Sequence, residues 1–332
     1  MSDLTSRRAF LSSVAVTGAV LAGAVAPWAR AAGAVGGPNA DAAADPNAPA
    51  GAAGTLLIGG DLQVNRLGFG AMRITGDGIW GEPRDANEAF AVLRRAVQLG
   101  TNFIDTADAY GPYISERLIR EALYPYPRGL LIATKGGQVR PRQDEWLADG
   151  RPEHLRAACE SSLTRLKLER IDLYQLHRPD PEVPYEDSIG ELAKLQKEGK
   201  IRHIGVSNVN AEQLAKARAL VRVVSVQNRY NVADRSSDEV LGICEREQIA
   251  FLPWGPLAQA AQASSTPNKS LVALQAIAKE RKIDNNEAAL AWLLTRSPVM
   301  LPIPGTSQVK HLEDNVGAAK IKLTPAEMAR VA

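Results

Sequence analysis

Short apolar runs alternate with longer amphipathic segments from residue 67 to residue 318. Apolar runs of about four to eight residues are typical of buried strands, whereas a helical apolar repeat over a longer window indicates a helix. The runs predict strands at residues 67–70, 102–105, 130–135, 171–176, 201–206, 223–227, 249–253 and 299–303. The segments between and after them predict helices at residues 85–99, 115–123, 152–166, 185–197, 211–220, 238–247, 269–281, 286–294 and 308–318.

Eight strand–helix units are what an α/β protein with a (β/α)8 TIM barrel needs, because each parallel strand returns through a helix. Two further runs, 55–58 and 62–64, flank a Gly-Gly-Asp turn and predict an N-terminal β-hairpin that closes the bottom of the barrel. The alternative is a doubly wound sheet, which would carry a glycine-rich fingerprint directly after its first strand. The segment after residue 67 lacks the third glycine and the following helix, so the pattern favours the barrel.

The first residues differ in composition from the barrel. Residues 6–11 read Ser-Arg-Arg-Ala-Phe-Leu, which resembles a twin-arginine export motif, and an uncharged apolar run and the small residues of a cleavage site follow. We therefore expect residues 1–31 to be a twin-arginine signal peptide that the Tat translocation machinery recognises, with a periplasmic mature protein. The alternatives are an uncleaved anchor or a disordered tail, and a protein whose signal is not used would be cytoplasmic.

Residues 32–54 are rich in Ala, Gly and Pro and predict a flexible linker, which leaves residues 55–332 for the barrel domain. The chain of 332 residues has a formal net charge of +2 and no basic stripe interleaved with aromatics, so nucleic acid is not an expected partner. Cys159 and Cys244 lie far apart in helical segments, which favours two buried thiols over a disulfide. No Cys or His spacing indicates a metal site, and the mature chain is not expected to be embedded in a membrane.

Four side chains with acid–base chemistry follow three consecutive predicted strands. Asp105 and Tyr110 follow the second strand, Lys135 ends the third and His177 follows the fourth. Because the carboxyl ends of parallel strands meet at one rim of a barrel, these side chains can share one pocket. Each of them alone is more often a cap, a turn or a solvated residue, so the hypothesis depends on their joint placement.

This set of groups suits the protonation of a carbonyl oxygen. A carbonyl accepts hydride only if its oxygen gains a proton or a strong donor as charge develops. We expect the Lys135 ammonium to lower the pKa of the Tyr110 phenol, Asp105 to hold that lysine, and a neutral His177 to orient the substrate oxygen. General acid catalysis of this kind contributes roughly 10²–10⁴-fold. The residues therefore predict reduction of an aldehyde or ketone.

Six ordered segments carry a resemblance to the aldo-keto reductase family over residues 55–330. They read RLGFGAM at residues 66–72, NFIDTADAYG at 102–111, TK at 134–135, DLYQLH at 172–177, IGVSN at 204–208 and IPGT at 303–306. The resemblance implies a (β/α)8 barrel, an NADPH cofactor across the carboxyl-terminal rim, and carbonyl reduction. It also implies that Asp105, Tyr110, Lys135 and His177 are the catalytic residues, with Tyr110 as the acid.

The same resemblance implies cofactor-binding residues. Ser207, Asn208 and Gln227 match side chains that hold the nicotinamide carboxamide, and Trp254 stands where the family usually stacks a tyrosine on the nicotinamide ring. The positions beside the pyrophosphate, the adenosine and its 2′-phosphate are Gly255, Pro256, Leu257, Gly305, Thr306, Ser307, His311, Asp314 and Asn315. Two of these, Gly305 and His311, replace a lysine and an arginine common in the family, which weakens the preference for NADPH and keeps NADH as the alternative.

Substrate selection is expected in loops over the rim. Trp80, Tyr113 and Trp146 follow the first three strands and predict an aromatic lining, although Trp80 and Trp146 alternatively only pin their loops. A second hypothesis is an NADPH-binding redox sensor or regulatory subunit with little turnover, because a periplasm has no obvious supply of NADPH. A third is a barrel hydrolase with Asp105 and Asp108 as its carboxylates.

Overall fold

The computed structural model describes residues 47–257 and 268–332. The signal peptide expected at residues 1–31 and most of the linker expected at residues 32–54 lie outside the described residues. The chain divides into two units, Met1–Val35 and Gly36–Ala332, and every described residue belongs to the second. Within the described ranges, the helices are all too short or too polar to cross a membrane.

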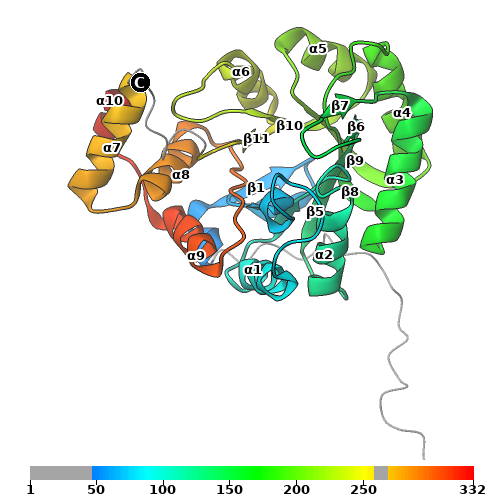
Figure 1. The fold of residues 1–332 in the computed structure, drawn as a ribbon. Coiled ribbons are helices and arrows are strands. Elements are labelled where there is room, and N and C mark those ends of the chain that lie inside the picture. Colours follow the sequence, from blue (N-terminus) through cyan, green and yellow to red (C-terminus); the bar gives the residue numbers. More distant parts are fainter. Residues whose placement is uncertain (1–46, 258–267) are drawn as a thin grey trace, which may run out of the picture. The chain divides into compact units, whose positions relative to one another are not determined.

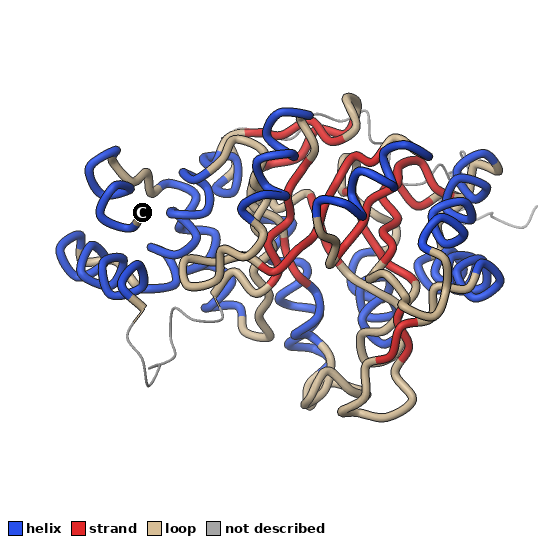
Figure 2. The backbone as a smooth tube through the Cα atoms, turned by 90° about the horizontal axis from the view of Figure 1, so that it is seen from above, coloured by secondary structure: helices blue, strands red, loops and turns tan. Residues whose placement is uncertain are grey.

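Seven parallel strands form one curled sheet, in the order β11-β10-β9-β8-β5-β4-β3 (Figures 1 and 2). Their bounds are β3 (Phe69–Gly70), β4 (Phe103–Asp105), β5 (Leu131–Gly136), β8 (Ile171–Leu176), β9 (Ile201–Ser207), β10 (Val223–Arg229) and β11 (Ala250–Trp254). The apolar runs predict all seven to within about two residues. In the register, Asp105 pairs with Ala133, and Lys135 pairs with Gln175. The carboxyl ends of β5 and β8 are therefore level with one another, and β4 ends at the same rim opposite Ala133, three residues before the end of β5.

The helices lie outside the sheet (Figure 1). Their bounds are α1 (Ala86–Gln98), α2 (Ile114–Leu123), α3 (Pro152–Leu166), α4 (Tyr185–Lys197), α5 (Ala211–Leu220), α6 (Asp238–Glu247), α7 (Lys269–Arg281), α8 (Asn285–Arg296), α9 (Val309–Gly317) and α10 (Pro325–Val331), with 3₁₀ turns η2 (Ala71–Ile74) and η3 (Ala318–Lys320). Side-chain caps start several of them: the Asp85 carboxylate accepts from the Asn87 amide at 2.8 Å before α1, and Asn210 and Asp284 form capping boxes at α5 and α8.

Apolar side chains form two buried clusters. The larger cluster lies between the strands and the helices, and Cys159 and Cys244 belong to it as free, buried thiols, which confirms that expectation. The smaller cluster joins side chains of β4, β5, β8, β10 and β11, among them Phe103, Leu173 and Leu252. Parallel strands buried on both faces read as continuous apolar runs, which is why the sequence reveals them.

The segment at residues 299–303, predicted as the eighth strand, closes the sheet without forming a regular strand. The Leu301 amide donates to the Phe251 carbonyl at 2.8 Å, and the Gly68 and Gly70 amides donate to the carbonyls of Pro302 and Pro304 at 2.9 and 3.2 Å. Two prolines without N–H groups cannot complete a ladder, which explains the difference from the prediction. Together the strands and this closing segment, the seam at residues 299–305, make a (β/α)8 TIM-barrel-like fold.

An antiparallel hairpin precedes the barrel, as the sequence predicts. Strand β1 (Thr55–Ile58) pairs with β2 (Leu62–Asn65), and Gly59 and Gly60 in the turn have φ angles of 64° and 86°. The hairpin places Ile58, Leu62 and Val64 in the smaller apolar cluster. The Asp61 carboxylate in the turn contacts the His203 ring at 2.6 Å.

The predicted linker does not extend to residue 54. A 3₁₀ turn, η1 (Pro49–Ala53), packs on the barrel: Ala50 is fully buried, and its amide donates to the Leu99 carbonyl at 2.9 Å. Small residues permit this close contact, since a Cβ at Gly100 would lie 2.2 Å from the Cβ of Ala48. The same small residues make the segment look like a flexible linker in the sequence.

The sequence also gives no sign of a second hairpin, β6 (Gln138–Val139) with β7 (Leu147–Ala148), in the loop after β5.

The close approach of β3 to the seam gives a stability test. A Cβ at Gly70 would lie 2.6 Å from the Ile303 carbonyl oxygen, so we expect Gly70→Ala to lower the free energy of unfolding by about 1–3 kcal/mol through forced backbone shifts. Gly190 on α4 has open space at the same position, and Gly190→Ala should raise stability by about 0.5–1 kcal/mol. Urea unfolding measures both. Equal effects of the two substitutions would contradict the packing at the seam.

Candidate active site

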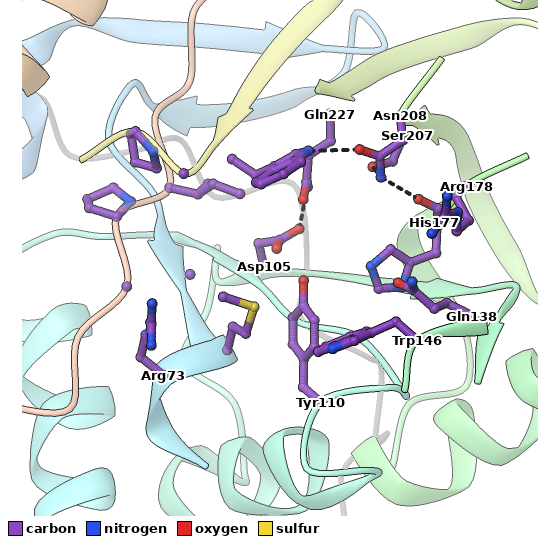
Figure 3. A pocket seen from close by; sticks show the side chains of 18 of the residues that line it. Arg73, Asp105, Tyr110, Gln138, Trp146, His177, Arg178, Ser207, Asn208 and Gln227 are labelled. Atoms are coloured by element: carbon purple, nitrogen blue, oxygen red, sulfur yellow. Dashed lines mark hydrogen bonds between the residues drawn. The ribbon is translucent and has the colours of Figure 1, made fainter. Parts of the chain in front are cut away.

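A cavity of about 750 Å³ lies at the carboxyl ends of the strands (Figure 3). Its lining includes thirteen positions drawn from all parts of the barrel rim: Gly70, Met72, Asp105, Tyr110, Gln138, Trp146, His177, Ser207, Gln227, Trp254, Pro256, Ile303 and Gly305. Three of the four predicted catalytic residues therefore line one cavity. The fourth, Lys135, is fully buried directly behind two of them.

The Lys135 ammonium is the centre of this group. It donates to the Asp105 carboxylate at 2.7 Å, to the Thr106 carbonyl at 2.8 Å and to the Tyr110 hydroxyl at 3.3 Å. The second carboxylate oxygen of Asp105 accepts from the Gln227 amide at 2.8 Å. A buried ion pair costs desolvation energy unless hydrogen bonds satisfy its remaining atoms, and these contacts do so.

Electrostatics assign a protonation state to each group. Burial by itself lowers the pKa of Lys135, but the charge of Asp105 and the hydrogen bonds outweigh it, and the net shift is upward. Burial raises the pKa of Tyr110 above its ordinary value of 10.0, and Lys135 only partly opposes that shift. Lys135 thus lowers the Tyr110 pKa as expected, but burial outweighs it and the net shift is upward, because the sequence cannot show how deeply the phenol is buried. At neutral pH Tyr110 is a phenol, the form that donates a proton.

The His177 imidazole faces the same cavity. Its ring lies edge-on to that of Tyr110, with centroids 5.8 Å apart, and burial followed by the charges of Lys135 and Arg178 holds its pKa well below the ordinary value of 6.5. The ring is therefore neutral at pH 7, as the sequence predicts. Within the described ranges its Nδ1 atom is buried without a hydrogen-bond partner.

The side chains at the ends of β9, β10 and β11 form the opposite wall. Asn208 has a φ of 57°, and its amide donates to the His177 carbonyl at 3.0 Å and to the Ser207 hydroxyl at 3.1 Å. The Trp254 indole donates to the Asn208 side-chain oxygen at 3.0 Å, which fixes both side chains (Figure 3). Ser207, Asn208, Gln227, Trp254, Gly255, Pro256 and Leu257, all predicted from the resemblance, line the cavity together.

Of the last predicted segment, only Gly305 lines the cavity. A Cβ there would lie 2.5 Å from the Gly70 carbonyl oxygen and 3.5 Å from the Arg73 side chain, so close packing against β3 explains why a glycine occupies this position. The other residues lie just before α9 or within it; Thr306 and Asn315 are buried, and Ser307 and His311 are exposed. Asp314 forms an ion pair with Lys310 at 2.8 Å.

Only one of the three predicted substrate-pocket aromatics lines the cavity. Trp146 does, with its ring centroid 6.5 Å from that of Tyr110. Trp80 instead stacks with Arg140, whose guanidinium lies 5.4 Å from Trp80 and 3.6 Å from Trp146 and so pins the two loops together. Tyr113 also lies outside the cavity: it is the residue before α2, 54% exposed, and its ring packs under Arg165.

Six further side chains that the sequence does not single out also line the cavity: Met72, Arg73, Gln138, Arg178, Ile303 and Pro304. Each lies at the end of a predicted strand or follows it by a few residues, so position at a strand end was the available signal. Arg178 directly follows His177 in the sequence, yet an arginine after a strand is usually only a solvated residue. The fold alone shows that these side chains reach the cavity.

Asp108 is not among the lining residues, which removes the carboxylate pair that a hydrolase would need. Burial, followed by the charge of Glu116, raises the pKa of Asp108 from 3.8 to about 8. Arg165, the nearest cation of that cluster, is ion-paired with Glu116 at 2.6 Å. Asp108 is therefore a buried, neutral carboxyl group at pH 7, two residues from Tyr110.

This raised pKa predicts the pH dependence of stability. Between pH 3.8 and about 8, Asp108 is protonated in the folded chain and ionised in the unfolded chain, so its contribution to stability falls as pH rises through that window. Asp108→Asn imitates the neutral carboxyl group. We expect its free energy of unfolding to exceed that of the wild type at pH 8, with a gain that shrinks towards pH 4. Urea unfolding at both pH values, with the exposed Asp144→Asn as control, measures the effect, and a gain independent of pH contradicts it.

Comparison with known proteins agrees with this geometry. The model of the Aldo/keto reductase family matches residues 66–332. An "uncharacterized oxidoreductase" of Schizosaccharomyces pombe is 51% identical over 279 residues, 84% of this chain and 89% of that protein. The pyridoxine 4-dehydrogenase of Escherichia coli is 42% identical over 272 residues, 80% of this chain and 93% of that protein. A crystal structure of an aldo-keto reductase from Klebsiella pneumoniae in complex with NADPH superimposes with a TM-score of 0.70, at 26% identity, over 83% of this chain and 93% of that one. The chain belongs to the aldo/keto reductase family.

Proposed function

We propose that this protein is an NADPH-dependent oxidoreductase that reduces an aldehyde or ketone to an alcohol. The observation that carries the proposal is the Tyr110 hydroxyl, which lies in the cavity wall 3.3 Å from a fully buried lysine ammonium and beside a neutral histidine. Proton donation to a carbonyl oxygen needs a phenol at neutral pH and a nearby charge that stabilises the phenolate as it forms. Both conditions hold at Tyr110.

Each residue of the site then has a definite task. Tyr110 gives its proton to the carbonyl oxygen, and the phenolate that results is stabilised by Lys135. Asp105 fixes the ammonium group at 2.7 Å and keeps it charged. The neutral His177 ring supplies a hydrogen-bonding nitrogen towards the same oxygen and fixes its position in front of the phenol.

The residues of the opposite wall fit a nicotinamide cofactor in their chemistry. Amide and hydroxyl groups at Ser207, Asn208 and Gln227 suit a carboxamide, and the Trp254 indole offers an apolar face for an aromatic ring. Residues 255–257 and the start of α9 would supply backbone groups for phosphates, and the resemblance assigns the adenosine end to Gly305, Thr306, Ser307, His311, Asp314 and Asn315. When bound, NADPH supplies the hydride that the carbonyl carbon accepts.

Titration with each nucleotide, followed by turnover on an aldehyde panel, tests the function. We expect tighter binding of NADPH than of NADH and oxidation of NADPH on 4-nitrobenzaldehyde and on pyridoxal. Pyridoxal belongs in the panel because the Escherichia coli relative is named a pyridoxine 4-dehydrogenase. Binding without turnover would favour a redox sensor instead, and binding of neither nucleotide would contradict the cofactor assignment.

The tyrosine gives the sharpest single substitution. Tyr110→Phe removes only the hydroxyl, so we expect kcat to fall by roughly 10²–10⁴-fold while the Kd for NADPH stays the same. Tyr124→Phe, a matched change at the far side of α2, should keep full activity. Stopped-flow NADPH oxidation and fluorescence titration measure the two quantities. Full turnover in Tyr110→Phe would contradict the role of this residue as the acid.

We further propose that residues 1–31 direct export through the twin-arginine pathway and that hairpin β1–β2 closes the end of the barrel away from the cavity. Contact of Asp61 with His203, near the start of β9, supports the position of the hairpin, since Ser207 at the cavity ends the same strand.

Fractionation tests the export signal: a bacterium expressing the chain should hold it in the periplasm, cut after Ala31. Replacing Arg7 and Arg8 by lysine should keep it in the cytoplasm, and equal export of both forms would contradict a twin-arginine signal.

A further inference from the structure

Arg178 is a cation in the cavity wall without a partner of its own. It directly follows β8 and His177, lines the cavity, and is exposed to it. Among residues 47–257 and 268–332, no side chain forms an ion pair or a hydrogen bond with it. Asp180, the acid closest to it in sequence, is occupied by the backbone amides of Gly150 and Glu182, at 2.8 and 2.9 Å.

Among the described residues that line the cavity, no carboxylate is free to neutralise this charge. Asp105 is the acidic side chain among the residues that line it, and it already binds Lys135 and Gln227 at 2.7 and 2.8 Å. The charge of Arg178 also acts on His177, whose pKa it helps to lower. Within the described part of the chain the Arg178 guanidinium is therefore unpaired, and it is free to bind an anionic group of a ligand.

The position of Arg178 bears on which ligand this is. The lining residues that suit a cofactor follow β9, β10 and β11 or lie at 303–305, whereas Arg178 follows β8, next to His177. Figure 3 shows Arg178 beside His177 and Gln138, with Arg73, the other lining arginine, on the far side of Tyr110. Arg73 packs against Gly305 at the end of the cavity proposed for the cofactor. Arg178 is thus left for the substrate.

We propose that the substrate is a planar carbonyl compound that carries an oxyanionic group, a carboxylate or a phosphate, and that Arg178 binds this group while Tyr110 and His177 meet the carbonyl oxygen. A guanidinium presents paired N–H donors that match the two oxygens of such an anion. Trp146 lines the same cavity and offers an aromatic ring beside the acid, with its centroid 6.5 Å from that of Tyr110. This inference rests on the proposed reductase function and makes Arg178 a determinant of specificity.

Two pairs of aldehydes isolate the anion. In 4-carboxybenzaldehyde and 4-nitrobenzaldehyde the para substituents have nearly the same shape, and only the first is charged. Pyridoxal 5′-phosphate and pyridoxal make the corresponding phosphate pair. We expect the wild type to have a KM for the charged member of at least one pair that is about tenfold lower than for the neutral one, and that advantage to shrink at high ionic strength. The pair that shows the larger difference tells whether the natural anion is a carboxylate or a phosphate.

Arg178→Gln then tests the residue. We expect KM for the preferred charged aldehyde to rise about tenfold to a hundredfold, with KM and kcat for its neutral partner within about twofold of the wild type. Arg178→Lys should recover only part of the loss, because a lysine cannot bind both oxygens. Arg170→Gln is the matched control: it removes the same charge from an exposed residue at the opposite end of β8 and should change nothing.

The possible outcomes test the anion site at Arg178 separately from the reductase function. Turnover of all four aldehydes with no preference for a charged one, or an equal loss on charged and neutral aldehydes in Arg178→Gln, overturns the anion site and leaves the reductase in place. A weaker Kd for NADPH in Arg178→Gln, with unchanged aldehyde selectivity, assigns the residue to the cofactor and also overturns the proposal. A wild type that reduces no aldehyde contradicts the reductase, and the inference falls with it.

Discussion

The ion pair between Lys135 and Asp105 is the constraint on which the site depends. Both groups are buried, so each would carry a large desolvation penalty if the other were displaced. The pair forms only because β4 and β5 are in a register that places Asp105 opposite Ala133, two residues before Lys135. Gln227 on β10 then reaches across the barrel to the same carboxylate. The Asp105 carboxylate thus links the register of β4 and β5 to the contact across the barrel with Gln227. Through Lys135, it also influences the charge environment of the Tyr110 hydroxyl.

The same arrangement explains why the acid is a phenol with a raised pKa. A fully solvated tyrosine beside a lysine would have its pKa lowered, and that reasoning alone suggests a partly ionised acid. In the barrel, burial acts on both partners, and it penalises the phenolate more than the lysine stabilises it. The lysine charge is therefore available when negative charge develops on the phenol oxygen during proton transfer. A proton held in the resting state and released towards a polarised carbonyl is what such a donor requires.

Sequence periodicity predicts the barrel well, because parallel strands are apolar on both faces and helices carry caps such as Asp85 and Asn210. The four candidate catalytic residues are predictable for the same reason, since the ends of the strands fix their positions without knowledge of side-chain contacts. Other features depend on how deeply a side chain is buried and on the direction in which it points, and sequence periodicity does not contain this information. Tyr113 looks like Trp146 in the sequence, yet it turns outwards as the residue before α2. Residues 299–303 look like a strand until the missing N–H groups of Pro302 and of the adjacent Pro304 are considered.

The seam between β3 and residues 299–305 has a consequence for ligand binding. Ile303, Pro304 and Gly305 line the cavity, and their segment is also the one that joins the first and last strands of the sheet through a few hydrogen bonds. A nucleotide lying on this wall would contact the segment that joins β11 to β3 and would hold these two edges of the sheet together. By linkage, any ligand that binds only the closed barrel adds RT ln(1 + [L]/Kd) to its stability. In this protein a bound cofactor would thus stabilise the barrel as well as supply hydride. Its loss would lower the stability of the contact between β3 and residues 299–305.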